Sequence, residues 1–393
     1  MSKLEKLIQQ YCPDGVEYYH LNDVAIIKRG ERVTKAQLIP NGQYPVISGG
    51  VKPLGYLNRY NRKANTITIA QYGTAGYVDW QQNQFWANDV CYSVFPSKII
   101  NNRFLYFVLL HNQQLLYSLK TNAIPACLPL DRLAGVEIPV PPLPVQEEIV
   151  RILDAFTELQ AELQAELQKR KQQYNFYRDN LLNFKNINRG GQEIKWMKLK
   201  DVATQWYRGA GIKREEVGNE GMPCIRYGEI HTSYNIWFKD CISHTDETKQ
   251  ATKKYAEYGD ILFAITSEDI PLVGNSVAYL GKEKIMVGGD IVVMKHNQDP
   301  RYMAYALSTS DAIKQKGKGK VKSKVVHTNV PSLQEIVIPI PPMEEQQRIA
   351  DILDRFDTLT TDLTQGLPAE MEKRRQQYEF YRDKLLTFKR KEA

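Results

Sequence analysis

Apolar residues recur at alternating spacings of three and four in two long stretches of the chain. In the first stretch they are Ile149, Ile152, Phe156, Leu159 and Leu163, then Tyr174, Tyr177, Leu181 and Phe184. In the second they are Ile349, Ile352, Phe356, Leu359 and Leu363, then Tyr378, Tyr381, Leu385 and Phe388. This spacing is typical of an amphipathic helix with an apolar seam for a partner helix. The matching seams predict two long helices that pack on each other, antiparallel, as structural core.

Both helical stretches belong to a segment that the sequence contains twice. Residues 134–185 and 334–389 share a buried-strand pattern, a double proline, and a helix that ends in QQY-x-FYRD-x-LL-x-FK. Outside these copies the two halves match far more weakly, although residues 18–25 and 196–203 open each half in the same way. A repeated frame that holds two different inserts predicts a binding protein with two different surfaces in a two-fold arrangement.

Mixed α/β patterns fill the two inserts. Strand-like runs occur at residues 44–48, 66–70, 90–95, 136–140, 261–265, 276–280, 291–294 and 336–340. Each insert also contains one amphipathic helix, which begins at the N-cap Asn101 or Asp299. The predicted fold is α+β, with two mixed α/β domains joined by the pair of long antiparallel helices. The predicted segments are an N-terminal segment (1–17), a first mixed domain (18–143), a central helix (144–186), a second mixed domain (187–343) and a C-terminal helix (344–393).

The two long helices differ in length by one four-residue unit. Asp154 aligns with Asp354, an offset of 200, whereas Arg178 aligns with Arg382, an offset of 204. The middle of the first helix reads TELQ-AELQ-AELQ, and its counterpart reads TTDL-TQGL-PAEM. Four helical residues add about 6 Å of length. The glycine and proline at Gly366–Pro368 predict a kink or break in the second helix.

Composition places the chain among ordinary globular proteins. Its 393 residues are 42% hydrophobic and 25% charged, with a net charge of +7 that favours a polyanionic partner only weakly. None of the five cysteines has C-x-x-C spacing, which favours reduced thiols in the cytoplasm. The sequence shows neither the apolar core of a signal peptide nor an apolar run of the ~20 residues that a membrane helix needs. We therefore expect a cytoplasmic protein without a membrane partner.

Catalytic motifs are absent from the sequence. There is no G-x-x-x-x-G-K-[ST] loop, no G-x-S-x-G elbow, no Pro-Pro-aromatic methyltransferase motif and no Cys/His cluster at metal spacing. Two glycine-rich stretches, at residues 209–214 and 317–322, begin like a dinucleotide fingerprint but lack its third glycine. The sequence therefore predicts no catalytic residue, no metal site and no cofactor bound by this chain.

Basic residues gather in both inserts and suit contacts with phosphates. In the first insert the candidates are Arg29, Arg32, Lys35, Arg62 and Lys63. In the second they are Arg208, Lys213, Arg214 and three lysines of an alternating run, Lys316, Lys318 and Lys320. Lysine and arginine clusters supply affinity for nucleic acid without reading its sequence. An extended form would project the alternating lysines to one side, although a solvated loop is equally compatible with the pattern.

Base recognition needs polar side chains near these cations. Two loops at matching places after a strand, residues 71–78 and 265–276, supply such side chains. Tyr72, Thr74 and Ser267 are the candidates in these loops, and ordinary turn chemistry is the alternative.

A second apolar contact is predicted on the long helices. Phe176 and Phe380 each follow a seam tyrosine by two residues, which is about 200° around a helix. Their rings therefore point away from the seam. The partner for this face is either another subunit or, as the alternative, an insert or the N-terminal segment.

Several quoted sequences together resemble the specificity subunits of type I restriction–modification systems. They are the opening EKLIQQYCPDGVEYYHLNDVA, the paired IPVPPLPVQEEI and IPIPPMEEQQRI, the helix ends of the RRQQYEFYRD type, and the four-residue repeat. The run YPVISGG…GYLNRYNRKANTITIAQYGTAGYV…FWANDVCYSVF also resembles one type of target recognition domain. The resemblance spans nearly the full length of the chain.

This resemblance implies a non-catalytic subunit that binds a bipartite, asymmetric double-stranded DNA target, one half-site per recognition domain. Two methyltransferase subunits would methylate adenine with S-adenosylmethionine, and restriction/translocase subunits would use ATP and Mg. In this interpretation Phe176, Phe380, Arg178 and Arg382 face the methyltransferase subunits, and the four-residue units set the spacer.

Two other functions are compatible with parts of the sequence. A fused methyltransferase-type enzyme is disfavoured because its motifs are absent, and a coiled-coil scaffold that does not bind DNA would not explain two dissimilar basic domains. Neighbouring genes for a methyltransferase and a large helicase-nuclease would discriminate between these functions.

Overall fold

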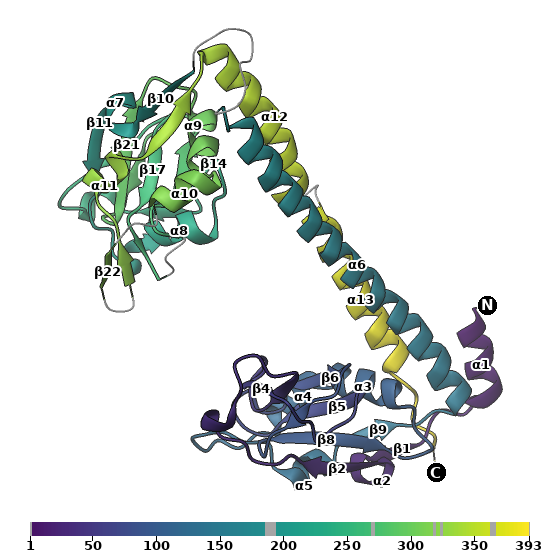
Figure 1. Ribbon diagram of the computed structural model, residues 1–393. Helices are drawn as coiled ribbons and strands as arrows, with labels where there is room; N and C mark the ends of the chain where they lie inside the picture. The colour runs from purple at the N-terminus through teal and green to yellow at the C-terminus, as the bar shows by residue number, and fades with distance from the viewer. Residues whose placement is uncertain are drawn as a thin grey trace. The chain divides into compact units, whose positions relative to one another are not determined.

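The computed structural model describes residues 2–184, 194–268, 272–316, 320–322, 325–361 and 367–392 (Figure 1). The chain forms two compact units. The first consists of Met1–Gln164 with Glu370–Ala393, and the second of Ala165–Ala369. Each unit contains one mixed domain together with parts of the long helices. The units therefore cut across the predicted helical segments.

An antiparallel four-stranded sheet forms the centre of the first domain. Its strand order is β2-β8-β5-β6, and every residue of β5 is buried. A smaller sheet has the order β4-β3-β7, in which β3 and β7 run parallel. The strands are β2 (Ala25–Arg29), β3 (Tyr44–Ile47), β4 (Gly55–Leu57), β5 (Thr66–Ala70), β6 (Val78–Gln81), β7 (Trp86–Ala87) and β8 (Cys91–Pro96).

Short elements frame the first domain. Strand β1 (Tyr18–His20) pairs antiparallel with β9 (Glu137–Pro139), so the start and end of the domain lie together. The helical elements of this part are α1 (Lys3–Tyr11), α2 (Leu21–Val24), η1 (Lys35–Gln37), α3 (Asn102–His111), α4 (Gln113–Ser118) and α5 (Leu130–Ala134).

The second domain repeats this architecture with additions. Its main sheet has the order β11-β21-β17-β19-β14, in which the first four strands match the sheet of the first domain. Their bounds are β11 (Ala203–Arg208), β14 (Trp237–Phe238), β17 (Ile261–Ala264), β19 (Ser276–Tyr279) and β21 (Ile291–His296).

Two further sheets complete the second domain. One has the order β12-β15-β13-β20-β16, and the other has the order β18-β23-β22. Their bounds are β12 (Val217–Gly218), β13 (Met222–Ile225), β15 (Ser243–Thr245), β16 (Tyr255–Ala256), β18 (Thr266–Ser267), β20 (Ile285–Val287), β22 (Lys320–Lys322) and β23 (Val325–His327).

Strand β10 (Lys195–Lys198) pairs antiparallel with β24 (Val337–Ile340), as β1 does with β9. Among the helical elements, α9 and α10 follow the last strand of the main sheet as α3 and α4 do in the first domain. The helical elements are α7 (Leu199–Val202), η2 (Arg214–Glu216), α8 (Tyr227–Thr232), η3 (Glu247–Lys249), α9 (Pro300–Leu307), α10 (Ser310–Lys316) and α11 (Val330–Gln334).

The first double proline is followed by the long helix α6 (Leu143–Leu181). The second is followed by two long helices, α12 (Met343–Thr361) and then α13 (Leu367–Leu386). In the first unit, Phe156 of α6 stacks on Tyr381 of α13. In the second unit, Tyr177 near the end of α6 stacks on Phe356 of α12. The early part of α6 thus contacts the late part of the C-terminal copy, and the late part of α6 contacts the early part of that copy. The predicted antiparallel pairing and the predicted fold class are confirmed. Of the predicted break at Gly366–Pro368, Gly366 lies outside the described part of the chain, whereas Leu367 and Pro368 are the first residues of α13.

The prediction of a single long helix in each insert is wrong, because this stretch forms two helices in each domain, α3 and α4 in the first and α9 and α10 in the second. Both predicted N-caps are confirmed: the Asn101 side chain accepts hydrogen bonds from the next turn, and so does that of Asp299. Polar side chains then bond to the backbone of the preceding turn, which competes with continuation of the helix. These are Asn112, which donates to the Val108 carbonyl at 3.1 Å, and Thr309, which donates to the Ala306 carbonyl at 2.8 Å.

Candidate nucleic-acid interface

The predicted cations of the first domain lie where the chain leaves β2. We name Arg29, Arg32 and Lys35 the first cationic segment. Arg29 is the last residue of β2, and its guanidinium lies 5.9 Å from the centroid of the Tyr92 ring. Arg32 is paired loosely with Asp89, with 79% of the arginine side chain exposed and an N···O distance of 4.0 Å. Lys35 begins the short helix η1 and is also exposed. This segment therefore offers solvated positive charge.

The second domain presents the same arrangement. We name Arg208, Lys213 and Arg214 the second cationic segment. Arg208 ends β11 and forms a 2.6 Å ion pair with Asp290. Arg214 begins η2 as Lys35 begins η1, and both are exposed. Cations therefore occupy equivalent backbone positions in two domains whose sequences differ.

A glycine lets each segment leave its sheet. A Cβ atom on Gly30 would lie 2.1 Å from the Ala87 carbonyl oxygen, and one on Gly209 would lie 2.2 Å from the Gly288 carbonyl oxygen. Any larger residue would push the cationic segment away from the neighbouring backbone. The repeated Arg-Gly pair in the sequence therefore marks a close backbone approach in both domains.

Arg62 lies beside the first cationic segment but faces inward. Its guanidinium donates to the Ser93 hydroxyl at 3.0 Å, to the Asn61 carbonyl at 2.8 Å and to the Arg29 carbonyl at 2.7 Å. These bonds use several of its five donors within the protein. Arg62 therefore braces the backbone of the segment, whereas the neighbouring Lys63 is exposed.

The two predicted recognition loops differ in how much of their candidates they expose. Tyr72 is half-buried and forms an isolated antiparallel bridge with Cys127. Thr74 is half-buried, and its backbone N–H donates to the Gly49 carbonyl at 2.7 Å. Ser267 is buried in β18, where it pairs with Val326 of β23. Ser267 therefore lies in a paired strand and not in the predicted loop.

Neither the extended form nor the solvated loop that the lysine run allowed applies to Lys316. This residue ends helix α10, is only 5% exposed and donates from Nζ to the Ser276 hydroxyl at 3.0 Å. Burial lowers the pKa of its ammonium group to about 7. A side chain enclosed in this way does not reach a phosphate. Lys318 lies outside the described residues, and Lys320 is described only by its backbone in β22.

The predicted off-seam aromatics are solvated on both long helices. Phe176 and Phe380 are each 63% exposed. The two arginines predicted for the same partner interface are instead bonded to aspartates of their own helices. Arg178 donates from Nε and Nη2 to Asp179, and Arg382 donates in the same way to Asp383. Arg178 is buried, so that it is not part of an open surface in the second unit.

Sequence reasoning missed a glutamine that ties each double proline to its domain. Gln146 and Gln346 are buried and donate to the carbonyls of Pro141 and Pro341 at 2.6 and 2.8 Å. Their side-chain oxygens accept from the backbone N–H of the N-caps of α3 and α9. The position of this glutamine shortly after each double proline was visible in the repeat. Its meaning was not, because glutamine in a helix is usually solvated.

Metal clusters and membrane-spanning helices are absent from the described part of the chain. Within the described ranges, no group of three or more His, Cys, Asp or Glu side chains could hold a metal ion. The same residues include no helix that is both long and apolar enough to cross a membrane.

Comparison with known proteins identifies the family. The model of the type I restriction modification DNA specificity domain matches the chain twice, at residues 13–170 and 192–373. A putative type I restriction enzyme specificity subunit of Haemophilus influenzae is 30% identical over 98% of this chain and 98% of its own length. A type I restriction enzyme specificity subunit of Escherichia coli is 30% identical over 100% of this chain and 98% of its own length.

Solved structures share the fold. The S subunit of the type I restriction–modification system from M. genitalium superposes with a TM-score of 0.56 and 17% identity, covering 95% of this chain and 96% of that one. A chain from a study of assembly and conformational transition in the type I system gives a TM-score of 0.60 with 14% identity, covering 95% and 98%. The chain belongs to the family of type I restriction–modification specificity subunits. The predicted family is thereby confirmed.

Proposed function

We propose that this chain selects a bipartite, asymmetric DNA target, with one half-site bound by each mixed domain. The observation that carries the proposal is the equivalent placement of the two cationic segments on one repeated scaffold. Lys35 and Arg214 begin matching short helices, and Arg29 and Arg208 end matching strands. Such cations supply affinity for phosphates, and the loops around them differ between the domains. Two different loop sets favour two unrelated half-sites.

The same proposal assigns the chemistry to partner subunits. Methylation of an adenine inside a duplex requires the base to leave the stack and enter an active site. This chain would position two methyltransferase subunits, which use S-adenosylmethionine, and restriction/translocase subunits, which use ATP and Mg. The exposed Phe176 and Phe380 are the docking points that we assign to the methyltransferase subunits, since a solvated phenylalanine repeated on both helices suits an apolar interface.

Sequencing of methylated adenines tests this function directly. DNA exposed to the complex assembled from this chain and its methyltransferase subunits should carry one bipartite motif with two unrelated half-sites and a fixed spacer. A palindromic motif or methylation without a sequence preference would refute the proposal.

Exchange of a single domain tests whether the two domains recognise their half-sites independently. Replacement of residues 18–143 by the equivalent insert of another specificity subunit should change one half-site only. A change in both half-sites would contradict independent recognition by the two domains.

A further inference from the structure

The helix that follows the sheet of the first domain is held at both ends by aspartates of the long helices. Near the start of α3, Arg103 Nε donates to Asp154 Oδ1 of α6 at 2.8 Å. At the end of α3, His111 Nδ1 lies 3.0 Å from Asp383 Oδ1 of α13. One aspartate thus comes from each helix of the antiparallel pair. We name these two contacts the first aspartate clamp.

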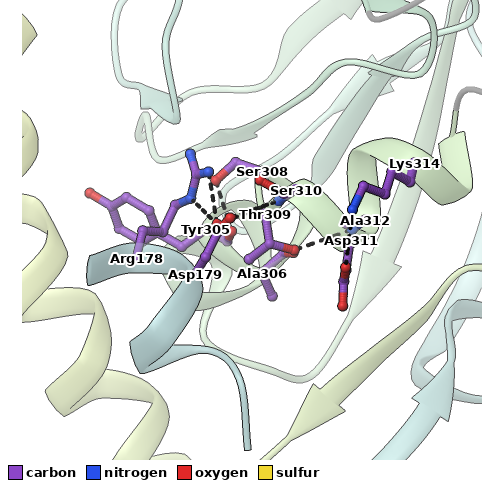
Figure 2. Close-up of polar contacts among 10 residues, drawn as sticks. All are labelled: Arg178, Asp179, Tyr305, Ala306, Ser308, Thr309, Ser310, Asp311, Ala312 and Lys314. Atoms are coloured by element: carbon purple, nitrogen blue, oxygen red, sulfur yellow. Dashed lines mark hydrogen bonds and ion pairs between the residues drawn. The ribbon is translucent and has the colours of Figure 1, made fainter. Parts of the chain in front are cut away.

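The second domain is held in the same way at α9 and α10. Near the start of α9, Arg301 Nη1 donates to Asp354 Oδ2 of α12 at 2.8 Å. After the end of α9, the backbone N–H of Ser310 points at both carboxylate oxygens of Asp179, each at 3.4 Å (Figure 2). We name these two contacts the second aspartate clamp. It again takes one aspartate from each helix of its unit.

The clamp at Asp354 is reinforced by two further donors. Its Oδ1 accepts from the Tyr305 hydroxyl at 2.7 Å and from the Trp237 indole N–H at 2.9 Å. Arg301 also bonds to Asp351 at 2.7 Å. A carboxylate with several donors is fixed in direction as well as in position. The domain therefore has little freedom to rotate about α12 at this point.

The neighbouring arginine fixes the direction of Asp179. Arg178 Nε and Nη2 donate to its Oδ1 at 3.0 and 2.9 Å (Figure 2). Arg382 makes the same pair of bonds to Asp383, at 3.0 and 2.9 Å. The Arg-Asp pair in the FYRD sequence of each long helix thereby has a structural role, since its arginine orients an aspartate that contacts the domain.

We infer that Asp154, Asp383, Asp354 and Asp179 are positioning residues that determine how strictly the spacer between half-sites is enforced. The inference rests on the proposed function, because it concerns the same bipartite target. All four lie where a domain packs on its helices, so their hydrogen bonds contribute to the orientation of that domain. One base-pair step displaces a half-site by about 3.4 Å along the duplex. A domain released from one end of its clamp would follow such a displacement more easily.

The two clamps differ in a way that provides a matched control. His111 contributes a side chain, whereas Ser310 contributes its backbone N–H. His111→Ala therefore removes one end of the clamp in the first domain, while Ser310→Ala keeps the backbone donor in the second. Arg170→Gln is a second control, because Arg170 pairs along its own helix with Glu166 at 2.7 Å.

The test compares spacer selectivity and half-site identity in the same experiment. Full-length Asp154→Asn, Asp383→Asn and His111→Ala chains are assembled with their methyltransferase subunits and given a DNA library in which the spacer varies by one base pair at a time. We expect unchanged half-site bases and about a ten-fold loss of discrimination against the neighbouring spacers, the factor that corresponds to one weakened charge-assisted hydrogen bond. Ser310→Ala and Arg170→Gln should keep the wild-type discrimination.

Several outcomes would overturn the inference. One is wild-type spacer discrimination in all three variants, and another is altered half-site bases. If Asp154→Asn lowers the yield of folded chain, the milder His111→Ala decides the question, and unaltered discrimination in that variant contradicts the inference. Failure of the wild-type chain to produce any bipartite motif refutes the proposed function itself, which separates the two failures.

Discussion

Phe156 of α6 stacks on Tyr381 of α13, with ring centroids 5.5 Å apart and ring planes inclined by 24°. The second unit repeats the contact with the partners exchanged, since Tyr177 stacks on Phe356 at 6.0 Å and 22°. Each of these stacked pairs therefore reflects the two-fold relation between the two copies of the repeat. A phenylalanine from the early part of one helix meets a tyrosine from the late part of the other in both units.

Truncation of this stack should weaken the first unit. Phe156→Ala should lower the free energy of unfolding by about 2 kcal/mol, less than the ~3–5 kcal/mol of a fully buried phenylalanine, because the ring is not fully buried. Combination with Tyr381→Ala in a double-mutant cycle should give a coupling of about 0.5–1.5 kcal/mol. Denaturant titration measures both values. Strictly additive effects would show that the stacked geometry contributes nothing beyond burial.

Substitution of the solvated phenylalanines should impair assembly without loss of stability. Phe176→Ser and Phe380→Ser each replace a ring that is 63% exposed, so the free energy of unfolding should change by less than about 0.5 kcal/mol. Each single variant should bind one methyltransferase subunit and the double variant none, as measured by the mass of the assembled complex. Tyr258→Ser, at a tyrosine that is 66% exposed in the second domain, is the control. Full assembly of the double variant would refute the docking assignment.

Neutralisation of a cationic segment should reduce the salt dependence of DNA binding. The triple variant Arg29→Gln, Arg32→Gln and Lys35→Gln should lower the slope of log affinity against log salt by up to ~0.9 for each phosphate that is no longer neutralised. The matched triple variant carries Arg208→Gln, Lys213→Gln and Arg214→Gln. Each should weaken binding to its own half-site, with the bases of both half-sites unchanged. An unchanged slope in both variants would exclude a role for these segments in binding phosphates.

Burial of Lys316 should make stability rise with pH. Its pKa is lowered from about 10.5 in the unfolded chain to about 7, so the unfolded state binds more protons between these values. In this range the Lys316 ammonium group makes the free energy of unfolding rise by up to ~1.4 kcal/mol per pH unit, and its destabilising effect is largest below pH 7. Lys316→Met should raise the free energy of unfolding at pH 7 and flatten its increase from pH 7 to 9 in denaturant titrations. Lys314→Met, on the same helix with 79% of the lysine side chain exposed, should do neither. An equal pH slope in the Lys316 variant and the wild type would contradict the buried ammonium.

Deletion of one four-residue unit should shorten the preferred spacer. Removal of residues 161–164 takes about 6 Å from the middle of α6. The spacer in the methylated motif should change by about one to two base pairs, because each step along DNA is ~3.4 Å. Both half-sites should stay as they are. Different half-site bases in the methylation sequences would refute the role of this repeat as a spacer element.

The repeat and its hydrophobic pattern were sufficient to predict the frame of the protein. Alternating spacings of three and four predicted the antiparallel helices, and apolar runs predicted strands such as β5 at their observed bounds. Asn101 and Asp299 were recognised as N-caps because a short polar side chain there satisfies free backbone N–H groups. These features depend on neighbours within a few residues, and such information is local in the sequence.

Tertiary structure alone decided which of the candidate binding side chains are exposed to solvent. Lys316 and Ser267 belong to patterns that suggested solvated loops, yet helix α10 and strand β18 place both inside the second domain. Asp154 meets Arg103, 51 residues away, and Asp383 meets His111, 272 residues away. Hydrogen bonds over such separations leave no periodic trace in a single sequence, because they depend on how distant elements pack. The sequence by itself therefore determined the repeated scaffold and the family, whereas packing determined which cations are solvated and how each domain is attached to its helices.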